Sequence, residues 1–115
     1  MIKDTLFAQY IKERLNQEVI ENESGFIIYN INGKSCFLAE MYIKPDSRKS
    51  GLFIELLNEL KELAVENDCE HITATIHQYD KGATNSLSSA FKYGFKIHQA
   101  HNNIITIILN LSGGI

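Results

Sequence analysis

Several kinds of residue that mark particular classes of protein are scarce in this sequence of 115 residues. Lys and Arg number 11 against 14 Asp and Glu, which gives a net charge of −3. This deficit of positive charge argues against a protein that coats nucleic acid or an anionic membrane, so we expect neither partner. Charged residues also interrupt the N-terminal stretch every few positions, which argues against a signal peptide or membrane span there and favours a cytoplasmic location.

Cysteine and proline are scarce as well. The two cysteines, Cys36 and Cys69, are far apart and form no CxxC pair, which is typical of buried thiols in a reducing compartment and not of a metal cluster. A single proline, Pro45, and seven glycines leave no linker or low-complexity tract. A chain of this length buries roughly 60 to 70% of its unfolded surface, so the sequence predicts a single domain over residues 1–115.

What is present is a regular alternation of helical and extended patterns. Apolar residues recur at helical spacing in three segments, the first with Asp4 as the expected N-cap, and β-branched or aromatic residues form five short runs. The dipeptide Asn32-Gly33 between two of these runs predicts a β-hairpin. The expected helices cover residues 4–21, 51–66 and 85–92, and the expected strands cover residues 26–31, 36–43, 72–77, 95–99 and 104–111.

The order of these segments predicts the fold class. Residues 36–77 form a strand, a helix and a second strand, so the two strands should be parallel. We therefore expect an α/β (α+β) fold in the order αββαβαββ, with helices packed on a mixed, mostly antiparallel sheet. The last run, residues 104–111, is apolar on both faces, so it is either central in the sheet or paired with another copy of the chain in a homo-oligomer.

The four histidines do not suggest a metal site. His71 and His77 lie at the two ends of one expected strand, about 20 Å apart when it is extended, so they cannot share an ion. His98 and His101 flank a turn without a nearby carboxylate or thiol, which is typical of a surface loop.

The most informative segment joins the second expected strand to the second expected helix. Lys44, Arg48 and Lys49 make this loop locally basic, although the whole chain is acidic. Backbone amides in the first turn of a helix lack internal acceptors, and the helix dipole adds partial positive charge there. The segment therefore predicts binding of a phosphate or pyrophosphate. The alternative is that Ser50 caps the helix and that the basic residues balance its carboxylates.

The run AEMYIKPDSRKSGLF, which contains this loop, resembles the acetyl-CoA motif of the GNAT N-acetyltransferase superfamily. In that motif a strand ending in V-x-P precedes [RQ]-x-x-G-x-[GA] and a helix. Ile43-Lys44-Pro45 matches the first part, and Arg48 and Gly51 match the next two fixed positions, whereas Phe53 stands where the family has Gly or Ala.

A second motif of the same family resembles the C-terminal part of the chain. Gly94-Phe95 follows a short helix that contains Asn85, as the family's motif does, although Ala90 stands where the family has a tyrosine that acts as general acid. The resemblance covers residues 26–111 and is nearest to short GNAT-like proteins encoded by bacteriophages. The chain is short at its N-terminus, where the family usually has a first strand and a second helix that shape the acceptor side.

The resemblance implies acetyl-CoA as co-substrate. Amides of the loop and the first helical turn would hold the pyrophosphate, and the preceding strand would bind the pantetheine arm through its backbone and polarise the thioester carbonyl. The residues implied in binding acetyl-CoA are Met41, Tyr42, Ile43, Arg48, Lys49, Ser50, Gly51, Leu52, Phe53 and Asn85.

The resemblance also implies direct transfer of the acetyl group to an amine, on a small molecule or on a protein lysine or N-terminus. Glu40 is the carboxylate on the strand that would take up the proton of the amine, and its alternative role is that of a solvent-facing hairpin residue. Two other functions stay open. One is a GNAT-fold binding or structural protein without catalysis, for instance in a phage particle, which Phe53 and Ala90 favour. The other is a phosphate-binding module unrelated to acetyl transfer.

Overall fold

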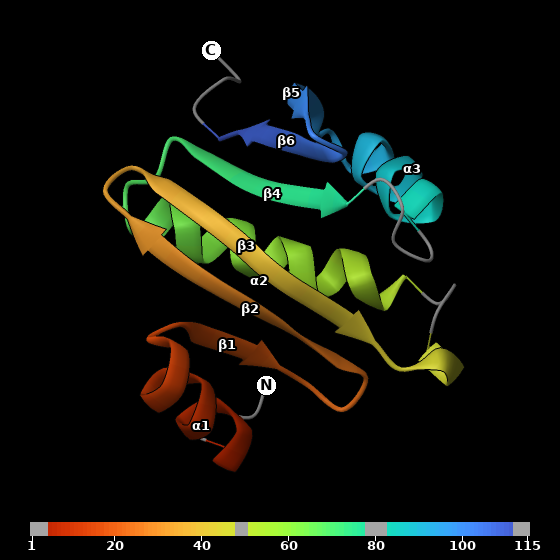
Figure 1. Ribbon diagram of the computed structural model, residues 1–115. Helices are drawn as coiled ribbons and strands as arrows, with labels where there is room; N and C mark the ends of the chain where they lie inside the picture. The colour runs from red at the N-terminus through yellow and green to blue at the C-terminus, as the bar shows by residue number, and fades with distance from the viewer. Residues whose placement is uncertain (1–4, 48–50, 78–82, 112–115) are drawn as a thin grey trace.

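The computed structural model describes residues 5–47, 51–77 and 83–111, which form three α-helices, six strands and one short 3₁₀ helix. Figure 1 shows these elements along the chain. In chain order they are α1 (Leu6–Leu15), β1 (Glu18–Glu21), β2 (Gly25–Asn32), β3 (Ser35–Ile43), the 3₁₀ helix η1 (Pro45–Ser47), α2 (Leu52–Glu66), β4 (His71–His77), α3 (Ala83–Tyr93), β5 (Lys96–His101) and β6 (Ile104–Asn110).

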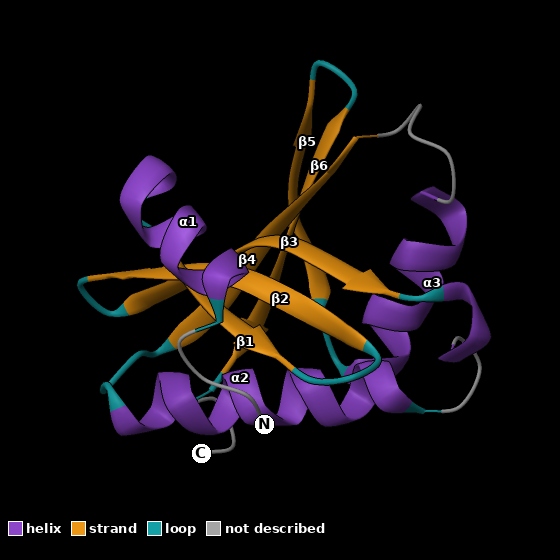
Figure 2. Ribbon diagram, turned by 90° about the horizontal axis from the view of Figure 1, so that it is seen from below, coloured by secondary structure: helices purple, strands orange, loops and turns teal. Residues whose placement is uncertain are grey.

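The six strands form one sheet in the order β1-β2-β3-β4-β6-β5. Only β3 and β4 are parallel, and the other four pairs are antiparallel. Figure 2 shows α1 on one face of the sheet and α2 on the opposite face. This confirms the predicted mixed, mostly antiparallel sheet flanked by helices. The parallel pair is also confirmed, since β3 precedes α2 in the chain and β4 follows it.

The first helix is shorter than the sequence predicted, and the prediction of a helix from Asp4 to Glu21 was wrong in two ways. The N-cap is Thr5, whose Oγ1 accepts a hydrogen bond from the amide of Ala8 at 3.0 Å. The helix ends because Asn16 adopts a left-handed conformation with φ 54°. The residues after it form β1, so the order of elements gains one strand before β2.

The main core lies between α2 and the sheet. The predicted apolar stripe of α2 is buried against it, and Leu56 and Leu60 have no exposed surface. Ile20, Ile27 and Ile72 supply the facing side chains from β1, β2 and β4. These strands lie on both sides of β3 in the sheet, so α2 is held across the strand that leads into the loop predicted to bind an anion.

The C-terminal elements agree with the sequence. The Phe95 amide donates to the carbonyl of Ala90 at 3.0 Å, and Gly94 has φ 122°, as in a glycine-terminated helix end. Asn102 and Asn103 both have positive φ and form the tight turn between β5 and β6. β6 lies between β4 and β5, so both of its edges are paired within the sheet.

Both cysteines are buried free thiols, as predicted. Burial raises the pKa of Cys36 from 9.0 to about 12, and the nearby Cys69 adds to the shift. The pKa of Cys69 is also raised, mainly by burial. A group whose pKa is raised by folding contributes its full stability below its unfolded pKa. This contribution is lost progressively as the pH rises toward the folded pKa, because the unfolded thiol ionises before the folded one does.

We therefore predict that the free energy of unfolding falls as the pH rises above about 9, the ordinary pKa of a thiol in the unfolded chain. Urea titrations at pH 8 and pH 10.5 would measure the fall, and it should be smaller in Cys36→Ala than in the unchanged protein. Equal falls in the two proteins would show that Cys36 does not contribute.

Candidate functional site

The two parallel strands separate part of the way along their length. β3 pairs with β4 from Ser35 to Leu38, opposite His71 to Ala74, and the pairing goes no further. At the same place β3 has one extra residue relative to β2, because Ile28 pairs with Glu40 while Tyr29 pairs with Leu38. Ala39 is thus a β-bulge, which bends a strand and increases its twist. The ends of β3 and β4 that face η1 and α3 are left unpaired with each other.

This opening between β3 and β4, which we call the gap, is bordered by residues 39–43 of β3 and 75–77 of β4. Successive residues of a strand present their amide and carbonyl groups alternately to the two sides. β3 remains paired with β2 here, so only alternate residues of β3 direct their backbone groups into the gap. β4 supplies no ladder partner to this part of β3, so an extended ligand can pair with the strand edge there.

Side chains beside the gap point to two faces of the sheet. Ile43 is buried and Met41 packs against the core on the α2 face, so Glu40 and Tyr42 lie on the opposite face. On β4, Ala74 is buried and Ile76 packs against the core. Thr75 and His77 are exposed on the same face as Glu40.

An aromatic row supports the β3 side of the gap. Phe7 of α1 contacts Phe26 of β2 with a centroid distance of 4.8 Å, and Phe26 stacks on Tyr42 at 5.7 Å. Such contacts stabilise a pair of rings by about 1 kcal/mol beyond their burial. The row ties α1 to the end of β3 and holds the Tyr42 ring toward β2, away from β4.

The N-terminus of α2 follows the end of β3 after η1. Gly51 is the N-cap, with φ 82° and no side-chain capping bond, and its carbonyl accepts from Ile54 at 3.0 Å. The amides of Leu52 and Phe53 have no acceptor among the described residues. Glycine adopts a left-handed φ without a steric penalty, which explains why a glycine stands at position 51. Ser50 is therefore not the N-cap, contrary to the alternative considered from the sequence. Residues 48–50, with their two basic side chains, lie outside the described residues.

Phe53 packs against the core. Its ring therefore does not occupy the space in front of the helix N-terminus, and the departure from a small residue at this position leaves the first-turn amides accessible. The side chains of Leu52 and Asn85 lie outside the described residues, although both belong to helical backbone.

The far end of α3 offers no hydroxyl to the gap. Ala90 is buried, and the Tyr93 hydroxyl donates to Asn58 Oδ1 of α2 at 2.6 Å. Burial raises the pKa of Tyr93. Tyr93 therefore joins the two helices. Tyr79 lies outside the described residues.

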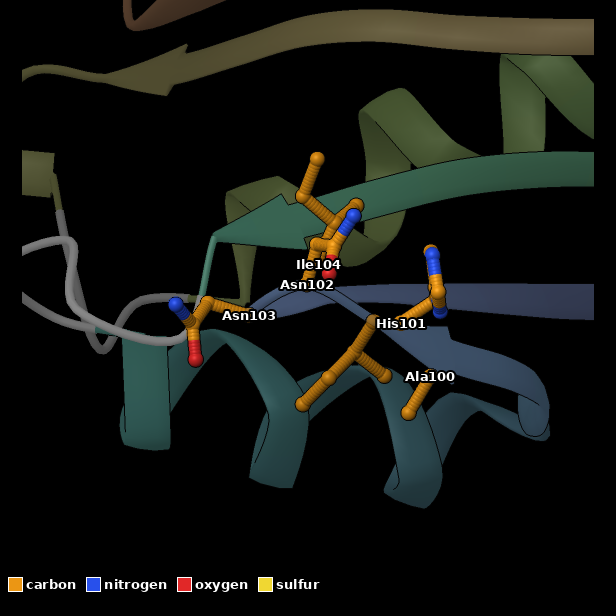
Figure 3. Close-up of a pocket in the computed structure, with 6 residues that line it drawn as sticks. Ala100, His101, Asn102, Asn103 and Ile104 are labelled. Carbon is orange, nitrogen blue, oxygen red and sulfur yellow. The ribbon is translucent and has the colours of Figure 1, made fainter.

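A shallow hollow lies elsewhere, at the turn between β5 and β6 (Figure 3). Ala100, His101, Asn102, Asn103, Ile104 and Ile105 line it. None of these six residues is a carboxylate or a thiol. His98 and His101 are exposed, but both belong to strand β5, so the prediction of a surface loop at these residues was wrong. Among the described residues, no three His, Cys, Asp or Glu side chains are grouped closely enough to hold a metal ion. Within the same residues, no helix is long and apolar enough to cross a membrane.

The inward position of Phe53 predicts a difference between two neighbouring substitutions. Phe53→Ala should lower the free energy of unfolding by about 2 kcal/mol, because the ring leaves a partly buried site. Ile54→Ala, at a side chain that is 44% exposed, should change it little. Urea unfolding of the two variants would test this, and equal effects would show that the Phe53 ring does not face the core.

The fold is shared with several solved acetyltransferase structures. The PaiA N-acetyltransferase of Thermoplasma acidophilum, solved with coenzyme A, has a TM-score of 0.70 at 20% identity, over 76% of this chain and 53% of that chain. This chain thus spans about half the length of that enzyme. A GNAT-family protein of Desulfovibrio desulfuricans has a TM-score of 0.74 at 15% identity, over 90% of this chain and 78% of the other.

A shorter protein is also similar. The anti-CRISPR protein AcrVA5 has a TM-score of 0.66 at 16% identity, over 78% of this chain and 96% of that chain. Among curated proteins, no sequence matches this chain significantly. A family model, that of the acetyltransferase (GNAT) family, matches residues 10–91, which is well over half of the sequence. The chain belongs to the GNAT acetyltransferase family.

Proposed function

We propose that this protein is an acetyl-CoA-dependent N-acetyltransferase that transfers the acetyl group directly from the thioester to an amine. The observation that carries the proposal is the gap between β3 and β4, which opens beside the N-terminus of α2. An extended thioester arm needs a strand edge without a neighbouring strand, and an attached pyrophosphate needs the amides of a helix N-terminus and positive charge. This end of the sheet offers both features next to each other.

In this proposal the pyrophosphate of acetyl-CoA binds at residues 48–53. The amides of Leu52 and Phe53 point out of the first turn of α2, and Lys44, Arg48 and Lys49 add positive charge. The solved complex of the Thermoplasma enzyme with coenzyme A supports this assignment through the shared fold. Asn85, in the first turn of α3, completes the residues that we assign to acetyl-CoA.

The pantetheine arm pairs with residues 41–43 of β3, which border the gap. The acetyl group then lies in the gap, where an amide of β3 polarises its carbonyl. Glu40 is exposed on the face opposite α2, and we assign it the uptake of the amine proton, directly or through water. The acceptor is a small-molecule amine or a protein lysine or N-terminus.

Calorimetry tests the acetyl-CoA site. We expect the unchanged protein to bind acetyl-CoA at low salt and Arg48→Glu to bind it at least about tenfold more weakly, because one charge-assisted contact becomes repulsive. Lys61→Glu makes the same change of charge on an exposed part of α2 away from its N-terminus, and it should keep the affinity. No binding by the unchanged protein would overturn both the co-substrate and the enzymatic function.

Thiol release from acetyl-CoA in the presence of amines tests catalysis. With amines that are charged at neutral pH, Glu40→Gln should lower the rate about 10²-fold without weakening acetyl-CoA binding, since its role is proton transfer. Equal rates in the two proteins would remove Glu40 from the mechanism. Binding of acetyl-CoA without thiol release for any amine would favour the other function left open by the sequence, a GNAT-fold binding protein without catalysis.

A further inference from the structure

Acetyl transfer to an amine moves two protons, and the proposed role of Glu40 accounts for one of them. The carbon–nitrogen bond forms, the carbon–sulfur bond breaks, and an acceptor ammonium gives up two protons. One proton is released to solvent, and the other ends on the sulfur of the departing thiol. The second proton needs a group beside the sulfur that can give it up and regain it.

The described residues that border the gap include three side chains able to carry a proton: Glu40 and Tyr42 on β3, and His77 on β4. Glu40 is already assigned to the amine. Tyr42 is stacked on Phe26 of β2, which lies on the side of β3 away from β4. Tyr93 of α3 is bonded to Asn58 of α2.

His77 lies on the opposite side of the gap from Glu40. It is the last residue of β4 and is exposed on the same face as Glu40, because Ile76 before it packs on the core. It pairs with Ile104 of β6, which in turn pairs with His101, so its backbone is fixed within the sheet. A thioester arm bound along β3 brings its sulfur into the space between these two strands.

From this placement we infer that His77 returns the proton to the departing thiolate. The inference rests on the proposed acetyltransferase function. An imidazole suits the task because its ring nitrogens can both donate and accept a proton. Glu40 and His77 would then divide the two proton transfers between them, one on each side of the gap.

Hydroxylamine as acceptor isolates the step at sulfur, because it is uncharged at neutral pH and needs no prior deprotonation. With acetyl-CoA and hydroxylamine, the unchanged protein should release thiol faster than the uncatalysed reaction. His77→Gln should lower that rate about 10²-fold while calorimetry shows unchanged acetyl-CoA affinity. His71→Gln is the matched control, since His71 lies on the same face at the other end of β4, and it should keep the rate.

Added imidazole separates proton transfer from a structural role. It should restore much of the rate in His77→Ala and should not accelerate the unchanged protein. A wild-type rate in His77→Gln, or a loss in His77→Ala that imidazole does not restore, would overturn the role of His77 and leave the acetyltransferase function standing. Acetyl-CoA binding without thiol release by the unchanged protein would overturn the acetyltransferase function, and the role of His77 with it.

Discussion

The arrangement of the site depends on the partial pairing of β3 with β4. Backbone groups in a sheet interior are normally paired, so a segment of parallel strands without a ladder leaves hydrogen-bonding capacity for another chain or ligand. Here the ladder stops after Leu38, at the position where Ala39 bulges out of register with β2. One extra residue in β3 thus accounts for the direction of the strand, the opening beside it and the faces on which the following side chains lie.

The rest of the fold keeps that opening next to positive charge. The core between α2 and the sheet fixes the helix along its length, and η1 brings the chain from the end of β3 to Gly51 in a few residues. The first-turn amides of α2 therefore lie close to the end of the strand that borders the gap. In an acidic protein, the first-turn amides of α2 and the exposed Lys44 support the anion site that we propose at this end of the sheet.

Much of this could be predicted from the sequence. Strong periodicity located α2 and the strands around it to within a few residues, and Gly51 and Gly94 marked helix ends because both adopt positive φ. The first helix was predicted too long, since the apolar residues after Asn16 fit a helix as well as a strand and only the left-handed turn at Asn16 decides between them. The bulge could not be predicted from the sequence either. Ala39 lies in an apolar run like any strand residue, and only the register of β3 against β2 shows that it has no residue opposite it.

The place of His77 beside the gap is another feature that could not be predicted from the sequence. In the sequence it was only a histidine too far from His71 to share a metal ion, whereas the structure places it across the gap from Glu40. Alternation along β4 decides the face of the sheet on which His77 lies, but the gap that makes this face relevant comes from the bulge in another strand. Contacts between distant segments decide such features, and local patterns carry little information about them.

Amide hydrogen exchange at β3, measured residue by residue with and without coenzyme A, tests the central claim most directly. Without coenzyme A, the amides within residues 39–41 that face the gap should exchange readily, while those of residues 35–38 are protected by pairing with β2 and β4. Coenzyme A should slow exchange at the gap-facing amides of β3 and at the first turn of α2. Protection at these amides before coenzyme A is added, or no change after it binds, would contradict the account.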